Sequence, residues 1–143
     1  MDNVNILLVD DEVPFVETIT KRLSKRNLSI TPAYSGKEAL EKLKTTENID
    51  VVILDVKMPG MDGIATLQEI KKRHPLVEVI MLTAHATVES GIEGMKIGAF
   101  DYLMKPCDMD TLIAKVQEAS SKKRAHEEKI IAASIKEITG RMA

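Results

Sequence analysis

Short apolar runs alternate along the chain with longer segments in which apolar residues recur at helical spacing. The runs are typical of strands, which are expected at residues 6–9, 28–33, 51–54, 77–82 and 100–104. The amphipathic segments that follow them are expected to form helices around Val16–Leu23, at 37–44, from Ile64 to just before Pro75, at 88–96 and at 108–121. Strands and helices are therefore predicted to alternate strictly.

The third run, from Val51 to Leu54, is apolar at every position, so we expect helices to cover both of its faces. Strict alternation of strand and helix with short links requires right-handed crossovers and a parallel sheet. Pro14 fits the first turn of the first helix, and Asp11 or Glu12 could cap that helix. The pattern predicts an α/β fold, a doubly wound parallel sheet in a three-layer sandwich.

The composition is that of one globular domain, with 143 residues of which 44% are hydrophobic and 29% charged. Its 20 basic and 22 acidic residues almost cancel, so neither nucleic acid nor an anionic membrane is an expected partner. No apolar run approaches the roughly 18 residues of a membrane-spanning helix. Cys107 is the single cysteine and the first residues lack a secretory signal, so a cytoplasmic location is expected.

Residues 122–143 lie beyond the predicted domain helices and are expected to form an extra C-terminal helix that ends near Gly140. The apolar residues of its stripe are Ile130, Ile131, Ile135, Ile138 and Met142. Three arrangements remain open: the stripe packs on its own domain, it pairs with a partner helix as in a coiled coil, or it frays. The basic run 122–124 is expected to form a solvated face. We expect a globular domain at 1–121 and a helical extension at 122–143.

Chemistry is expected at the carboxyl ends of the strands, where doubly wound sheets bind ligands. The first strand runs into Asp10 and Asp11, the third into Asp55, the fourth into Thr83 and the fifth into Lys105. Asp55 follows a fully apolar strand, where a carboxylate is costly unless it has a partner. This position favours a functional role for Asp55 over a structural one.

Asp10, Asp11 and Asp55 would repel one another unless a cation neutralises them. Carboxylate oxygens suit a hard divalent ion such as Mg²⁺, which binds well to a few carboxylates together with phosphate oxygens. Aspartate is a covalent acceptor of phosphate, so Asp55 is the candidate nucleophile. Lys105 and Thr83 could then bind phosphate oxygens. Such a transfer depends on positioning more than on a general base.

Residues 4–121 resemble the receiver domain of two-component response regulators. The resemblance rests on four motifs in order, namely Asp10-Asp11, Asp55 with Met58-Pro59-Gly60-Met61-Asp62-Gly63, Thr83-Ala84 and Lys105-Pro106. It implies a flavodoxin-like (βα)5 fold with sheet order 2-1-3-4-5. It also implies Mg²⁺-dependent phosphorylation of Asp55 by a histidine kinase or a histidine phosphotransfer protein.

The resemblance further implies a set of metal ligands. Asp11 and Asp55 would bind Mg²⁺ directly, and Asp10 would act largely through a metal-bound water. The backbone carbonyl of Lys57 would be a further ligand. Lys57 and His85 also occupy positions that could tune the lifetime of the phosphate.

A switch is implied as well. Movement of Thr83 toward the phosphate would open space for Tyr102 to turn inward, which would change the face built from the fourth helix, fifth strand and fifth helix. The peptide between Lys105 and Pro106 is expected to be cis and to aim the ammonium group into the site.

These features predict a signalling switch that acts by binding a protein target, not an enzyme with a substrate of its own. One alternative is the N-terminal receiver of a larger transcriptional regulator, with residues 122–143 as a linker helix that self-associates into a homodimer. A remote alternative is an aspartyl-phosphate phosphatase of the haloacid-dehalogenase type. Those enzymes need Asp-x-Asp after the first strand, whereas Asp10 and Asp11 are adjacent here.

Overall fold

The structure is a computed structural model that describes residues 3–85 and 87–142, with side chains to residue 140. Five parallel strands form one sheet in the order β2-β1-β3-β4-β5, which confirms the predicted topology. The strands are β1 Val4–Val9, β2 Leu28–Ala33, β3 Val51–Leu54, β4 Glu78–Thr83 and β5 Asp101–Met104. The winding direction reverses between β1 and β3, and this is where such folds bind ligands.

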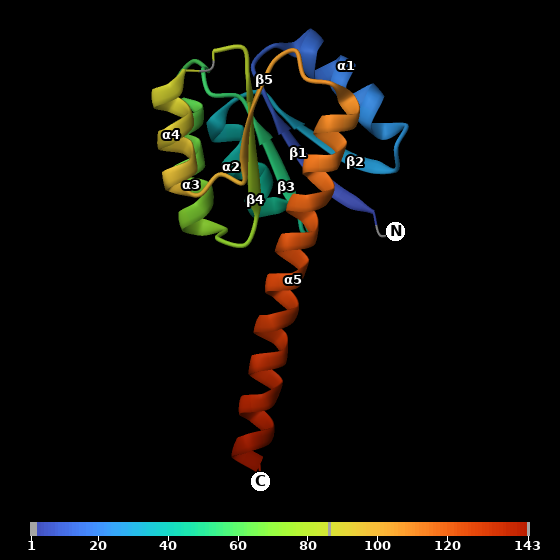
Figure 1. The fold of residues 1–143 in the computed structure, drawn as a ribbon, viewed down its shortest axis with the longest axis vertical. Coiled ribbons are helices and arrows are strands. Elements are labelled where there is room, and N and C mark those ends of the chain that lie inside the picture. The colour runs from blue at the N-terminus through green and yellow to red at the C-terminus, as the bar shows by residue number, and fades with distance from the viewer. Residues whose placement is uncertain (1–2, 86, 143) are drawn as a thin grey trace.

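Helices cover both faces of the sheet (Figure 1). They are α1 Val13–Ser24, α2 Gly36–Thr45, α3 Gly63–Arg73, α4 Val88–Ile97 and α5 Met109–Met142. The helices α1 and α5 pack on one face, while α2, α3 and α4 pack on the other. The molecule is thus the predicted three-layer, flavodoxin-like α/β sandwich.

Alternate strand residues point into the two different helix layers. Ile6 and Leu8 belong to the core beneath α1 and α5, whereas Leu7 and Val9 belong to the core beneath α2 and α3. All residues of β3 are buried, as its continuous apolar sequence predicts. The residue that follows β3 is therefore held on a rigid, fully packed element.

The loop between β1 and α1 makes a hydrogen bond and an ion pair at the carboxyl edge of the sheet. Pro14 lies in the first turn of α1, as predicted, and Glu12 is the N-cap residue. The predicted cap is wrong, because the Glu12 side chain makes no capping hydrogen bond. The Glu12 N–H donates to Asp10 Oδ1 (2.9 Å), and the Glu12 carboxylate lies 3.3 Å from Lys105 Nζ.

The C-terminal extension is helical, as predicted, and it continues α5 to Met142 instead of forming a separate helix. Residues 109–139 contain no glycine or proline, so nothing in the chain interrupts α5. Gly140 lies inside α5 and not at its end, since one glycine costs a helix only about 1 kcal/mol. The Met142 side chain lies outside the described residues.

Beyond its contacts with the domain, α5 projects away from the sheet (Figure 1). The side chains of Ile130, Ile131, Ile135 and Ile138 are 52–58% exposed. The stripe therefore does not pack on its own domain, which was one of the three open arrangements. Among the described residues, no helix is long and apolar enough to span a membrane.

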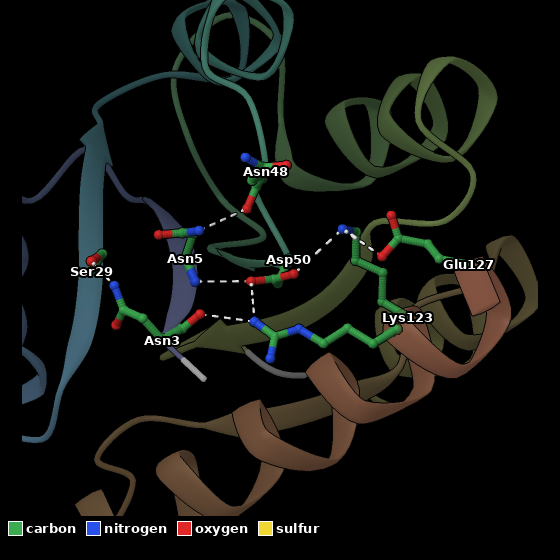
Figure 2. Close-up of polar contacts among 8 residues, drawn as sticks. Asn3, Asn5, Ser29, Asn48, Asp50, Lys123 and Glu127 are labelled. Atoms are coloured by element: carbon green, nitrogen blue, oxygen red, sulfur yellow. Dashed lines mark hydrogen bonds and ion pairs between the residues drawn. The ribbon is translucent and has the colours of Figure 1, made fainter. Parts of the chain in front are cut away.

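The basic run 122–124 does not form the solvated face that we expected. Asp50 precedes β3 and is 4% exposed; it accepts hydrogen bonds from the Asn5 N–H (3.0 Å), Lys123 Nζ (3.4 Å) and the Arg124 guanidinium (3.2 Å). Figure 2 shows Asp50 between Asn5 and Lys123. Lys122 Nζ lies 2.9 Å from the buried Glu78 carboxylate. We call the contacting groups of six residues the amino-edge clamp, namely Asn5, Asp50, Glu78, Lys122, Lys123 and Arg124.

Candidate functional site

Three carboxylates gather at the carboxyl edge of the sheet, where β1 and β3 end. Asp10 and Asp55 are 1% and 2% exposed, while Asp11 is exposed. One oxygen from each lies within 4.8 Å of the others. The Asp10 N–H donates to the Ala33 carbonyl and the Asp55 N–H to the Val9 carbonyl, so the sheet's hydrogen bonding fixes both backbones.

Lys105 reaches this carboxylate cluster from the end of β5. Its Nζ lies 2.6 Å from Asp10 Oδ2 and 3.3 Å from Glu12 Oε1. The same ammonium group lies 3.8 Å from the centre of the Phe15 ring, a cation–π contact. The peptide between Lys105 and Pro106 is cis. The carboxylates of Asp10 and Glu12 and the face of the Phe15 ring together hold the Lys105 ammonium group at the site.

The pKa values of Asp10 and Lys105, which form the buried ion pair, are both raised, for different reasons. Burial raises the pKa of Asp10 above its ordinary value, even though the hydrogen bond from Lys105 opposes the shift. Burial lowers the pKa of Lys105, but the hydrogen bond and charge of Asp10, together with the charge of Asp55, outweigh burial and raise it. Lys105 therefore remains a cation near neutral pH.

Two loops bring the remaining residues to this edge. Asp55 Oδ1 accepts a hydrogen bond from the Val56 N–H (2.8 Å), and the Val56 carbonyl accepts one from the Gly63 N–H (2.7 Å) at the start of α3. The fully buried Thr83 accepts a hydrogen bond at Oγ1 from the His85 N–H (3.0 Å). Asp55 and Thr83 are thus each tied to the loop that follows them.

A cavity of about 410 Å³ lies between these two loops. Its lining residues are Val56, Lys57, Asp62, His85, Thr87 and Ser90. The cavity therefore lies beside the loop that follows Asp55.

The model of the response regulator receiver domain family matches residues 6–117. This chain belongs to that family. It is 42% identical over 118 residues to the transcriptional regulatory protein ZraR of Escherichia coli (strain K12), covering 82% of this chain and 26% of ZraR. It is 43% identical over 114 residues to the DNA-binding transcriptional regulator NtrC of Klebsiella pneumoniae, covering 80% of this chain and 24% of NtrC. The chain spans about a quarter of the length of these relatives.

Solved structures agree with the family assignment. A response regulator receiver domain protein from Clostridium thermocellum is 36% identical, with a TM-score of 0.80 over 85% of this chain and 98% of the other. NtrX from Brucella abortus is 31% identical, with a TM-score of 0.80 over 89% of this chain and 29% of NtrX. The chain is a receiver domain of two-component signal transduction.

The receiver's acidic cluster fits a hard divalent cation. Asp10, Asp11 and Asp55 supply only oxygen donors, and all three can turn an oxygen toward one point. Lys105 is the cation paired with this cluster, and a second cation would offset the remaining negative charge. Lys57 is exposed on the loop after β3 and lines the adjacent cavity.

Tyr102 occupies a different place from Thr83 in this structure. In the β4–β5 register, Tyr102 pairs with Met81, and Thr83 pairs with Met104. The Tyr102 hydroxyl lies 2.6 Å from Ser90 Oγ in the first turn of α4. The half-buried Tyr102 ring therefore packs between α4 and the core on that face of the sheet.

The sequence reasoning missed three features of the receiver. Phe15 lies beneath the Lys105 ammonium group, Ser90 contacts Tyr102, and the amino-edge clamp holds α5. A signal for the clamp existed, because Asp50 stands at the start of the most apolar strand and a run of three basic residues follows the domain helix. No comparable local signal marked Phe15 or Ser90.

Proposed function

We propose that this receiver accepts a phosphoryl group on Asp55 from a sensor histidine kinase or a histidine phosphotransfer protein. The observation that carries the proposal is the buried Asp55 carboxylate, grouped with Asp10 and Asp11 beside a fixed lysine ammonium group. An acidic cluster with two buried members is costly unless it binds cations, and the bound cations can in turn attract an anionic ligand. Phosphoryl transfer needs this combination of nucleophile and charge neutralisation.

In the proposed reaction, one Asp55 carboxylate oxygen forms a bond to phosphorus. The phosphorus–nitrogen bond of the donor phosphohistidine breaks, and its electron pair remains with the imidazole ring. Asp11 and Asp55 would hold Mg²⁺ directly, Asp10 would hold it through a water and the Lys57 carbonyl would add a ligand; the ion would supply charge neutralisation. The Val56 N–H already donates to Asp55 and helps to orient the carboxylate.

Two further residues act on the phosphoryl group in this proposal. The Lys105 ammonium group pairs with one phosphate oxygen, as a point charge that the Phe15 ring and Asp10 have already positioned. The Thr83 hydroxyl donates to another phosphate oxygen. Its movement toward the phosphate draws the β4–α4 loop inward and lets Tyr102 turn in, which changes the binding surface.

The surface that changes in this way is apolar. Side chains exposed on α4 and β5 are Val88 (79%), Ile92 (52%), Met95 (48%) and Met104 (62%). An exposed group of apolar side chains favours a protein partner over nucleic acid. The basic residues 122–124 are engaged with Asp50 and Glu78, so they support no nucleic-acid site either. Cys107 is the single thiol, which supports our proposal of a cytoplasmic location.

Incubation with Mg²⁺ and a small acyl phosphate tests the acceptor residue. We expect intact-mass spectrometry to show one added phosphoryl group on the wild-type chain and none on Asp55→Asn. A chelator is expected to abolish the adduct, because the acidic cluster then lacks its neutralising ion. Asp110→Asn, at an exposed position on α5, is the matched control and should be labelled like the wild type.

Equal labelling of Asp55→Asn and the wild type would place the acceptor elsewhere and overturn the proposal. Steady turnover of a small phosphate ester would instead favour the phosphatase alternative. The family match over residues 6–117 and the adjacent Asp10 and Asp11 both argue against that outcome.

We also propose that α5 continues into a linker through which two copies of the chain associate. The relatives ZraR and NtrC are transcriptional regulators about three times as long as this chain, which supports a receiver placed within a larger protein. Ile131, Ile135 and Ile138 follow a spacing of four and three residues, the spacing of a coiled-coil seam. All three side chains are more than half exposed.

Sedimentation equilibrium tests this association. We expect Ile135→Lys to weaken dimerisation at least about tenfold, because it puts a charge in the apolar seam. Ala133→Lys adds the same charge to the same helix two residues away, on the side that faces away from the seam, and should leave the dimer intact. A wild-type chain that stays monomeric at high concentration would remove the linker helix from the proposal.

A further inference from the structure

The helix α5 is held to the domain by apolar contacts along its first turns and by charged contacts where it leaves. Leu112, Ile113, Val116 and Ala119 belong to the apolar core. From residue 121 to residue 140, no apolar residue of α5 is buried, and the amino-edge clamp takes over as the contact with the domain. We propose that the amino-edge clamp fixes the direction and the rotation of α5 as it leaves the receiver.

The three cations of the clamp are consecutive residues of α5, so their side chains leave the helix in directions about 100° apart. Lys122 Nζ lies 2.9 Å from Glu78 Oε2. Lys123 Nζ lies 3.4 Å from Asp50 Oδ1, and the Arg124 guanidinium lies 3.2 Å from Asp50 Oδ2. The two oxygens of Asp50 thus bind neighbouring helix residues (Figure 2). Rotation or bending of α5 at this turn would lengthen at least one of the three contacts.

The two carboxylates of the clamp stand on rigid elements. Asp50 directly precedes β3 and Glu78 begins β4, and both strands are fully buried. The Asp50 N–H donates to the Asn5 carbonyl (2.9 Å), and the Glu78 N–H donates to the Asp50 carbonyl (3.3 Å). Lys71 on α3 lies 3.2 Å from Glu78 Oε1, on the oxygen that Lys122 does not bind. The carboxylates are therefore held independently of α5 and cannot follow it if it turns.

The same two strands position the proposed phosphorylation site at their other ends. Asp55 directly follows β3, and Thr83 is the last residue of β4. The clamp therefore ties α5 to the strands that hold the site, and not to the β4–α4 loop that moves in the proposed switch. The helix keeps its place relative to the site while the surface at α4 changes.

A fixed α5 also determines how a second copy can bind, a role that rests on the proposed association through Ile131, Ile135 and Ile138. The helix is uninterrupted from the clamp to these residues, so the clamp sets the direction in which their seam faces relative to the domain. Two associated receivers are then held at one mutual orientation. Setting a registry is the best-attested role of buried charged groups, which often add little net stability.

Pulsed electron paramagnetic resonance measures the direction of α5. The parent chain carries Cys107→Ser and two nitroxide labels, one at Lys72→Cys on α3 and one at Ala133→Cys on α5, and both positions are exposed. Dilution of the labelled chain into unlabelled chain restricts the measured distance to one molecule. We expect a narrow distribution of this distance in the parent chain.

The double substitution Lys122→Ala and Arg124→Ala loosens the clamp in the same labelled chain. It leaves each buried carboxylate one lysine partner, so the domain should fold. We expect the distance distribution to widen, because one ion pair to α5 remains where three had fixed the helix. Protection of the amides at 120–124 from hydrogen exchange should fall about tenfold, the combined factor of two partly exposed ion pairs.

Lys129→Ala with Lys136→Ala is the matched control, because it removes the same charge from the same helix at exposed positions beyond the domain. It should keep the narrow distribution of the parent chain. Equal widths for the parent and the loosened clamp would overturn the inference, because continuity of the helix alone would then fix α5. Equal widening in the control, or a broad distribution in the parent itself, would overturn it as well.

An undiluted sample with the label at Lys72→Cys alone reports the distance between two receivers. We expect a narrow distribution in the parent chain and a broad one when the clamp is loosened. A distribution between chains that stays narrow with the loosened clamp would contradict the role of the clamp in orienting the pair. Absence of any distance between chains would contradict the proposed association, and the mutual orientation with it, but not the fixed direction of α5 within one chain.

Discussion

Replacing Gly63 with alanine is expected to destabilise the receiver by about 3 kcal/mol and to impair phosphorylation of Asp55. A Cβ atom at Gly63 would overlap the Asp55 carbonyl oxygen and would lie 2.6 Å from the Val56 Cα. Both are backbone atoms, so no side chain can rotate away to relieve the overlap. The loop between β3 and α3 must move, and Asp55 must move with it.

Urea unfolding and intact-mass analysis after acyl phosphate treatment would measure the two effects of Gly63→Ala. Gly140→Ala is the matched control, because a Cβ there meets nothing within 4 Å. It should keep wild-type labelling and leave the stability of the domain unchanged. A Gly63→Ala chain with wild-type stability and labelling would show that the close approach of α3 to Asp55 is not needed.

Replacing Asp50 with alanine is expected to lower the free energy of unfolding by about 3 kcal/mol. The change removes one buried carboxylate and leaves the Asn5 N–H without its acceptor and Lys123 and Arg124 without a shared partner. Lys123 is only 8% exposed, and Glu127, 3.2 Å from its Nζ, would be left as its carboxylate partner. Hydrogen exchange should also quicken where α5 leaves the sheet, because the amino-edge clamp fixes that turn.

Asp110→Ala is the control for Asp50→Ala, since it removes an aspartate whose partner, Arg26, is 3.3 Å away but well exposed. An exposed ion pair of this kind contributes under about 1 kcal/mol. Equal losses for the two variants in chemical denaturation would contradict a special role for the clamp. A loss confined to Asp50→Ala would show that buried charge at the amino edge holds α5 on the domain.

The pattern of apolar residues predicted the fold of this receiver because its two signals, apolar runs for strands and helical spacing for helices, both lie among neighbouring residues. The strand from Val51 to Leu54 is apolar at every position and proved buried on both faces. The other predicted strands lie within two residues of those observed. The end of the last helix was less predictable: Gly140 lies inside α5, because one glycine costs a helix only about 1 kcal/mol.

The site was predictable for a related reason. Residues that directly follow parallel strands must meet at one edge of the sheet, whatever the details of packing. Asp10, Asp55 and Thr83 follow or end their strands, and the structure places all three at that edge. Their order along the chain therefore carried the spatial information, and the chemistry of the side chains indicated what could bind there.

The basic run at residues 122–124 shows where local patterns stop being informative. Charged residues on a helix are usually solvated, and nothing nearby in sequence shows that Asp50 and Glu78 lie under this turn of α5. Only the parallel arrangement of β3 and β4 brings those two carboxylates to the amino edge together. The contact between Ser90 and Tyr102 is hidden in the same way, because it joins two elements that are separate in the pattern.

The sequence by itself determined the order of strands and helices and the set of polar groups at the carboxyl edge of the sheet. Both follow from the spacing of apolar residues and from the residue that ends each strand. The tertiary structure alone decided the pairing of Lys105 with Asp10 and Phe15, the contact of Tyr102 with Ser90 and the direction of α5. Those features depend on distances between side chains on different elements, which packing fixes only after the chain has folded.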